Sequence, residues 1–178
     1  MIHWCVKTAP QIIPKNQDNT MSTTSMQVGD RLALLTGERP SVNARIAKHL
    51  KIAHVIGTAT RGGRRDREPH LDPAEVVALG LACLLAPAPH TNAAPRIWEV
   101  LSLRSESSSA TFGDDLIEAL LDGADIGELV IGIARGKTYA RLDGRLYGPA
   151  PTSAVRHVTV LGREAITLLA ELVQAAED

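Results

Sequence analysis

Residues 34–52 of the chain read LLTGERPSVNARIAKHLKI, and this stretch determines how the first half folds. Gly37 is a typical helix stop, and Pro40 suits the first position of a new helix. That helix is expected from about Ser41 to Ile52, because its apolar residues recur at intervals of three or four. The apolar residues are Val42, Ile46, Leu50 and Ala53. The opposite side of the helix is polar and basic.

The outward side of this helix carries candidate DNA contacts. At about 100° per residue, the residues that project away from the apolar side form one group. They are Ser41, Ala44, Arg45, Lys48 and Lys51. All of these except Ala44 are predicted to contact DNA, because a basic helix fits a major groove about 12 Å wide and reads guanine edges there. The alternative interpretation is an ordinary soluble surface.

A basic segment with two glycines follows, from Thr58 to His70. It is too polar for burial, so we expect an exposed loop or a short hairpin that acts as a wing. Its candidate DNA contacts are Arg61, Arg64, Arg65 and Arg67. Such arginines can enter a minor groove or bind the DNA backbone, and Gly62 and Gly63 allow close backbone approach. The alternative interpretation is a solvated linker.

Two further helices complete the first half. A short helix is expected from Val28 to Leu35, with Leu32 on its buried side. A longer helix begins after Asp72, which can cap it, with Pro73 in the first turn and Glu75 completing a capping box. This last helix is apolar on most sides, so it is predicted to form the core of the first half.

Charge is unevenly distributed along the chain. The formal net charge of the 178 residues is −1 at pH 7. Between Arg39 and Arg67, however, eight basic residues face one acid, which gives this segment a charge of +7 and leaves −8 for the rest. Segregation of this kind predicts one basic face on an otherwise acidic molecule, and a basic face indicates a nucleic-acid partner.

The second half alternates helical and strand patterns. Two helices are expected first, at about 92–104 and 114–122. Strands are then expected at 128–135 and 155–161, with a hairpin between them at 139–147, where Asp143-Gly144 is the signal for a type I′ turn. An amphipathic helix at about 163–175 ends the chain. The predicted fold class is α+β: a winged helix-turn-helix followed by a small α+β domain with a three-stranded antiparallel sheet.

Several function classes lack their sequence signals. Cys5 and Cys83 cannot form a disulfide framework or a zinc site alone, and neither a phosphate-binding loop nor a Gly-x-Ser-x-Gly motif occurs. His49 and His54 are wrongly spaced to share a helix face. We therefore predict no catalytic residues, no metal and no cofactor. Without a long apolar run or a secretory signal, a cytoplasmic protein with no membrane partner is expected.

The first half resembles a MerR-type winged helix-turn-helix over residues 28–86, and is also similar to excisionase-like and prophage regulators. The matching motifs are Leu34-Leu35-Thr36-Gly37, the helix from Val42 to Leu50, Arg61-Gly62-Gly63-Arg64-Arg65, and the helix start Leu71-Asp72-Pro73-Ala74-Glu75. The resemblance implies a first helix that ends at Thr-Gly, a recognition helix, a wing and a closing helix. It implies a DNA-binding regulator.

The predicted organisation has three parts: a leader at 1–25, a DNA-binding domain at 26–90, and a dimerisation or partner-binding domain at 91–178. We predict a sequence-specific double-stranded DNA-binding transcriptional regulator that acts as a homodimer. The alternative is a protein-interaction adaptor, antitoxin-like or a phage assembly protein, that uses the winged helix to bind another protein. An enzyme with an unrecognised site is a third hypothesis.

Overall fold

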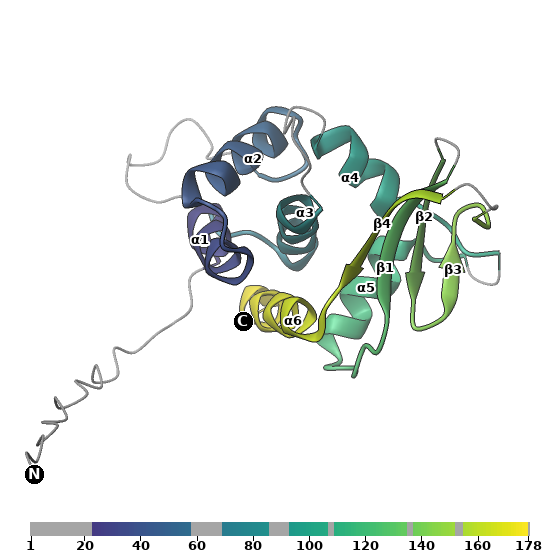
Figure 1. Cartoon of the computed structure of the whole chain (residues 1–178). Coiled ribbons are helices and arrows are strands. Elements are labelled where there is room, and N and C mark those ends of the chain that lie inside the picture. The colour runs from purple at the N-terminus through teal and green to yellow at the C-terminus, as the bar shows by residue number, and fades with distance from the viewer. Residues whose placement is uncertain are drawn as a thin grey trace, which may run out of the picture.

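The computed structural model describes residues 23–57, 69–85, 93–106, 109–134, 137–151 and 155–177. Within them the fold is α+β, with six helices and one four-stranded sheet (Figure 1). The helices are α1 (Ser25–Thr36), α2 (Pro40–Ile52), α3 (Pro73–Leu84), α4 (Ala93–Leu101), α5 (Phe112–Leu121) and α6 (Arg163–Glu177). The strands are β1 (Leu129–Ala134), β2 (Lys137–Leu142), β3 (Arg145–Tyr147) and β4 (Val155–Leu161). None of these helices is long and apolar enough to span a bilayer.

Local capping signals place the starts of α1 and α3. Asp72 accepts a hydrogen bond from the backbone N–H of Glu75, whose side chain accepts one from the backbone N–H of Asp72, so the predicted capping box is confirmed. Helix α1 begins three residues before the expected Val28, because Thr24 caps it. Thr24 and Ser25, at the end of the predicted leader 1–25, form the cap and the first residue of α1, and residues 1–22 lie outside the described residues.

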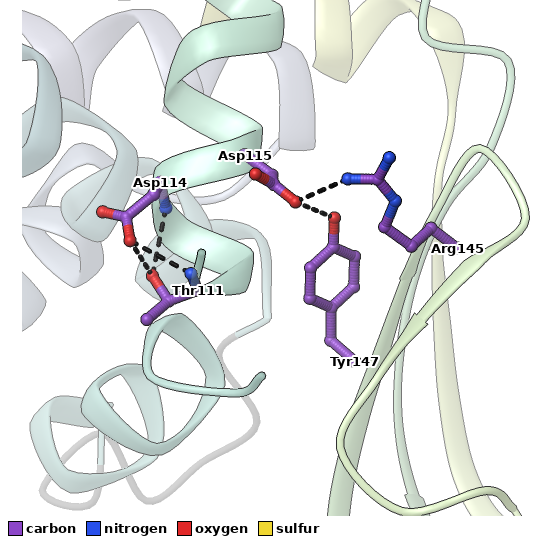
Figure 2. Close-up of polar contacts among 5 residues, drawn as sticks. All are labelled: Thr111, Asp114, Asp115, Arg145 and Tyr147. Carbon is purple, nitrogen blue, oxygen red and sulfur yellow. Dashed lines mark hydrogen bonds and ion pairs between the residues drawn. The ribbon is translucent and has the colours of Figure 1, made fainter. Parts of the chain in front are cut away.

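Helix α5 also begins earlier than expected, at Phe112 rather than Asp114. Figure 2 shows the reason: Thr111 and Asp114 form a second capping box. The Thr111 N–H donates to the Asp114 carboxylate at 3.0 Å, and the Asp114 N–H donates to the Thr111 hydroxyl at 3.2 Å. Hydrogen bonds from the Thr111 side chain and backbone also lower the pKa of Asp114.

The sheet is antiparallel and has the strand order β3-β2-β1-β4. The predicted count of three strands was wrong, because the hairpin contributes two separate strands, β2 and β3. Its turn is as expected: Asp143 and Gly144 have φ angles of 47° and 78°, the two positive values that a type I′ turn requires. The Asp143 carboxylate also accepts hydrogen bonds from the N–H groups of Gly127 and Glu128 at 2.7 and 2.9 Å, which holds the turn against the start of β1.

One hydrophobic core contains residues from both halves of the chain. Every residue of α3 from Val76 to Cys83 is buried, which confirms the prediction that this helix is a core element. The C-terminal helix α6 packs against α3, where Leu169 lies over Gly80. At the surface, Arg31 of α1 forms an ion pair with Glu171 of α6 at 2.7 Å. The last helix of the chain therefore helps to hold α1 and α3 in place.

Because Cys83 is buried, the stability of the fold is expected to decrease at alkaline pH. Burial raises the pKa of this thiol from 9.0 to about 12, so the unfolded chain loses the proton first as pH rises. The contribution of the buried thiol to the free energy of unfolding is complete below about pH 9 and is lost as the pH rises towards 12. Between pH 8 and 10.5 we expect wild type to lose about 2 kcal/mol more unfolding free energy than Cys83→Ala. Urea titrations of both proteins at the two pH values measure this difference, and equal losses would contradict it.

Candidate nucleic-acid interface

Helices α1 and α2 are joined by a turn of three residues, Gly37 to Arg39. Gly37 has a φ angle of 71°, and its N–H donates to the carbonyl of Ala33 at 2.9 Å, which ends α1 as the sequence predicted. Pro40 occupies the first turn of α2, also as predicted. Two packed helices joined by a short glycine-containing turn occur both in helix-turn-helix modules and in ordinary helical hairpins.

The buried side of α2 is anchored by a polar side chain. Asn43 is only 2% exposed, and its amide donates a hydrogen bond of 2.8 Å to the carbonyl of Gly29 in α1. The two helices are close at this point, where a β-carbon on Gly29 would be in ordinary van der Waals contact with the β-carbon of Asn43, at 3.4 Å. Ile46 and Leu50 are completely buried beside it. A directional bond between the two helices sets how α2 is held, because it is satisfied only at one arrangement.

Asn43 was not identified from the sequence, although its spacing offered a signal. All four buried residues of α2 lie at positions i, i+3, i+4 and i+7 of one helical face: Asn43, Ile46, Ala47 and Leu50. Ala53, by contrast, was expected on the apolar side and is exposed. Helix α2 ends at Ile52, so Ala53 no longer follows the helical projection.

The outward face of α2 matches the predicted one. Ser41, Ala44, Arg45 and Lys48 are exposed, and Lys51 is half-buried. No acidic residue occurs in α2, and His49 and Lys51 lie in its last turn, where positive charge is favourable. The structure thus brings together all the predicted contacts on α2 as one basic surface.

The four predicted wing contacts, Arg61, Arg64, Arg65 and Arg67, lie outside the described residues, so the wing stays a prediction. Both ends of that segment are described, however. The N–H of Gly57 donates to the carboxylate of Glu75 in α3. At the other end, His70 forms an isolated antiparallel bridge with Thr24, and the N–H of Leu71 donates to the carbonyl of Thr23 at 3.1 Å. The chain therefore enters the basic segment beside the N-terminal end of α3 and returns from it beside the N-terminal end of α1.

A groove of about 360 Å³ between α1 and α2 connects these features. Its α1 side includes Ser25 and Met26, the residues that follow Thr24, and its α2 side includes Lys48 and Lys51. The return point of the Arg-rich segment is thus close to the basic side of α2. Asp30 also lines the groove, so the basic surface is not without acid at its edge.

A second polar cluster joins α5 to the edge of the sheet. In Figure 2, the Asp115 carboxylate accepts hydrogen bonds from the hydroxyl of Tyr147 at 2.5 Å and from the guanidinium of Arg145 at 2.9 Å. Burial raises the pKa of Tyr147, and the bond to Asp115 raises it further. The Tyr147 ring also meets Phe112 edge-on, with 5.4 Å between centroids. These contacts tether α5 to the edge of the sheet.

Among the described residues, no three His, Cys, Asp or Glu side chains gather into a set that could hold a metal ion. No protein-family model matches the chain, and neither curated proteins nor solved structures give a match. Function is therefore inferred from the surface of α2 and its surroundings.

Proposed function

We propose that the chain is a sequence-specific, double-stranded DNA-binding transcriptional regulator that acts as a cytoplasmic homodimer. Helix α2 is its recognition helix. The observation that carries the proposal is the combination, in one helix, of a buried side bonded to α1 through Asn43 and an exposed side with Arg45 and Lys48. A recognition helix needs both properties, because its side chains must reach base edges from a rigid support.

The Arg-rich segment supplies the second part of the proposed contact. Its ends are attached at Gly57 and His70, and the latter adjoins the start of α1. From there, Arg64 and Arg65 would bind the DNA backbone or minor groove beside the helix in the major groove. This division of roles is the one that the resemblance to MerR-type regulators implies. No reaction is catalysed; the regulator would act by occluding or bending a promoter.

A protein-interaction adaptor is the second candidate, and one surface favours it. Leu34 is 87% exposed on α1, and it adjoins an open groove of about 760 Å³ between α1 and α6. Leu35 and Leu168 line that groove, and Arg31 and Glu171 lie at its side. Exposed apolar side chains around a groove are typical of protein-binding surfaces.

Salt dependence of duplex binding distinguishes the two candidates. If the basic surface binds DNA with about four phosphate contacts per subunit, the logarithm of affinity should fall with the logarithm of salt concentration with a slope near −4 per monomer, and about twice that for a dimer. Fluorescence anisotropy with a labelled duplex, at salt concentrations from 50 to 300 mM, measures the slope. Absence of duplex binding at low salt would overturn the DNA proposal and favour the adaptor.

A further inference from the structure

The two edges of the sheet differ in length and in protection. Strand β3 forms one edge with three residues, and its Arg145 is bonded to Asp115 of α5. Strand β4 forms the other edge with seven residues. Its side chains Val158 and Val160 are 48% and 67% exposed. Short, charged edges discourage strand pairing, whereas long apolar edges invite it.

A strip of apolar residues runs along the outer face of the sheet from β1 to β4. Leu129 and Ile131 of β1 point to the core that the sheet shares with the helices, so the alternate residues Val130 and Gly132 point to the other face. On that face, Val160 lies opposite Val130, and Val158 lies opposite Gly132. Val130 is 7% exposed, so burial of the apolar strip decreases towards the edge strand.

The second half of β4 has no device that would prevent pairing. From Val158 to Leu161 it contains neither a charged residue nor a proline. Among the described strands, none pairs with the outer side of β4, which leaves backbone N–H and C=O groups directed outward. Native proteins usually cover such an edge, because those groups and the two valines are otherwise solvated at a cost.

We propose that β4 pairs antiparallel with β4 of a second copy of this chain, around a two-fold axis at Thr159. In this register, Val158 of one protomer lies opposite Val160 of the other, and Val160 of the first lies opposite Val158 of the second. A two-fold axis makes equivalent edges meet antiparallel and closes the assembly at two copies. The inference deepens the proposed function, because it names the surface that forms the regulator's dimer.

Charge at the two ends of β4 supports a second copy as the partner. Near its start, the exposed Lys137 of β2 lies opposite Ala134 of β1, which in turn is the partner of Val155 of β4. Near its end are the acids Glu128, which precedes the partner of Leu161, and Glu164. A two-fold axis places the basic end of one strand beside the acidic end of the other, which favours this pairing.

One further charge at that end is already neutralised. Arg163 follows β4 closely, and its guanidinium pairs with Asp125 at 3.2 Å, so the acidic character of this end comes from Glu128 and Glu164. Figure 1 shows α1 and α2 on the far side of α3 from the sheet, so the proposed recognition helix and the proposed pairing edge belong to different parts of the molecule.

The oligomeric state of the full chain, measured without DNA, tests the inference. Sedimentation equilibrium should give wild type twice the chain mass of 19.0 kDa at tens of micromolar protein, and Val160→Lys should give a monomer. The matched control is Leu34→Lys, which also replaces an exposed apolar side chain with lysine, on α1, and should stay dimeric. Circular dichroism confirms that each variant is folded. A monomeric wild type, a dimeric Val160→Lys or a monomeric Leu34→Lys would overturn the proposal.

A cross-link tests the register. In a Cys5→Ser background, Thr159→Cys places two thiols opposite each other at the axis, where cross-strand Cα atoms are about 4.5–5.5 Å apart, within the range that a disulfide spans. Mild oxidation should give a covalent dimer, and adding Val160→Lys should remove it. Absence of the covalent dimer from Thr159→Cys would overturn this register. Neither measurement uses DNA. The DNA proposal can therefore fail while this one holds, and this one can fail while the DNA proposal holds.

Discussion

Replacing Gly80 with valine should destabilise the folded chain by about 3 kcal/mol or more. A β-carbon at Gly80 would lie 2.2 Å from a methyl carbon of Leu169, which is completely buried. Alanine would require the leucine to change its rotamer, while the larger valine would force α3 and α6 apart. Since these helices belong to opposite halves of the chain, the whole core should loosen. Urea unfolding followed by far-ultraviolet circular dichroism measures the loss.

Two controls separate this clash from a general effect of losing glycine. Gly162 has open space around its Cα, so Gly162→Ala should change the unfolding free energy by less than about 1 kcal/mol. Leu169→Ala removes the opposing methyl groups, so in that background Gly80→Ala should be neutral or stabilising, because alanine favours a helix by about 1 kcal/mol over glycine. A Gly80→Ala cost that is equal in both backgrounds would show that the two residues do not interact.

Replacing Arg45 or Lys48 with alanine should weaken binding to the preferred duplex by about 1–3 kcal/mol each, which corresponds to roughly 5- to 150-fold in affinity. Both side chains project from the exposed face of α2, where base edges would be read. Each change should also relax the preference at particular base pairs. Binding measurements with a panel of duplexes that differ at single positions would reveal this, once a preferred site has been selected from random sequences.

Variants elsewhere serve as comparisons for this result. Arg64→Ala and Arg65→Ala should weaken binding to all duplexes alike, because phosphate contacts carry no base identity. Arg104→Ala removes an exposed positive charge from the loop between α4 and α5 and should leave binding unchanged. If wing variants alter the base preference while the α2 variants do not, α2 is not the recognition helix. If Arg104→Ala weakens binding as much as Arg45→Ala, the effect is one of total charge.

Local sequence determined where most elements begin and end. The capping box at Asp72 and Glu75, the stop at Gly37 and the turn at Asp143-Gly144 were all predicted and are all present. β4 spans the predicted residues 155–161. These signals are reliable because each acts over a few residues through backbone geometry or a local hydrogen bond, so distant parts of the chain do not alter them.

The basic face of α2 was likewise predictable, whereas its support was not. Helical periodicity was enough to place Arg45 and Lys48 outward, because burial of Ile46 and Leu50 orients the helix. The bond from Asn43 to Gly29 joins residues 14 positions apart and exists only once α1 and α2 pack together. Asparagine side chains are usually exposed in proteins, so the burial of Asn43 results from the packing of α1 against α2.

Tertiary structure alone decided how the two halves meet and which strand lies at the edge. Leu169 and Gly80 are far apart in sequence, and nothing local to either residue indicates that one fills the space left by the other. The position of β4 beside β1, with its outer edge unpaired, likewise follows from strand order and not from strand sequence. Short-range hydrogen bonding and periodicity therefore determined the helices and strands. Long-range packing determined which of them lie side by side, because complementary shape and burial arise only when distant segments meet.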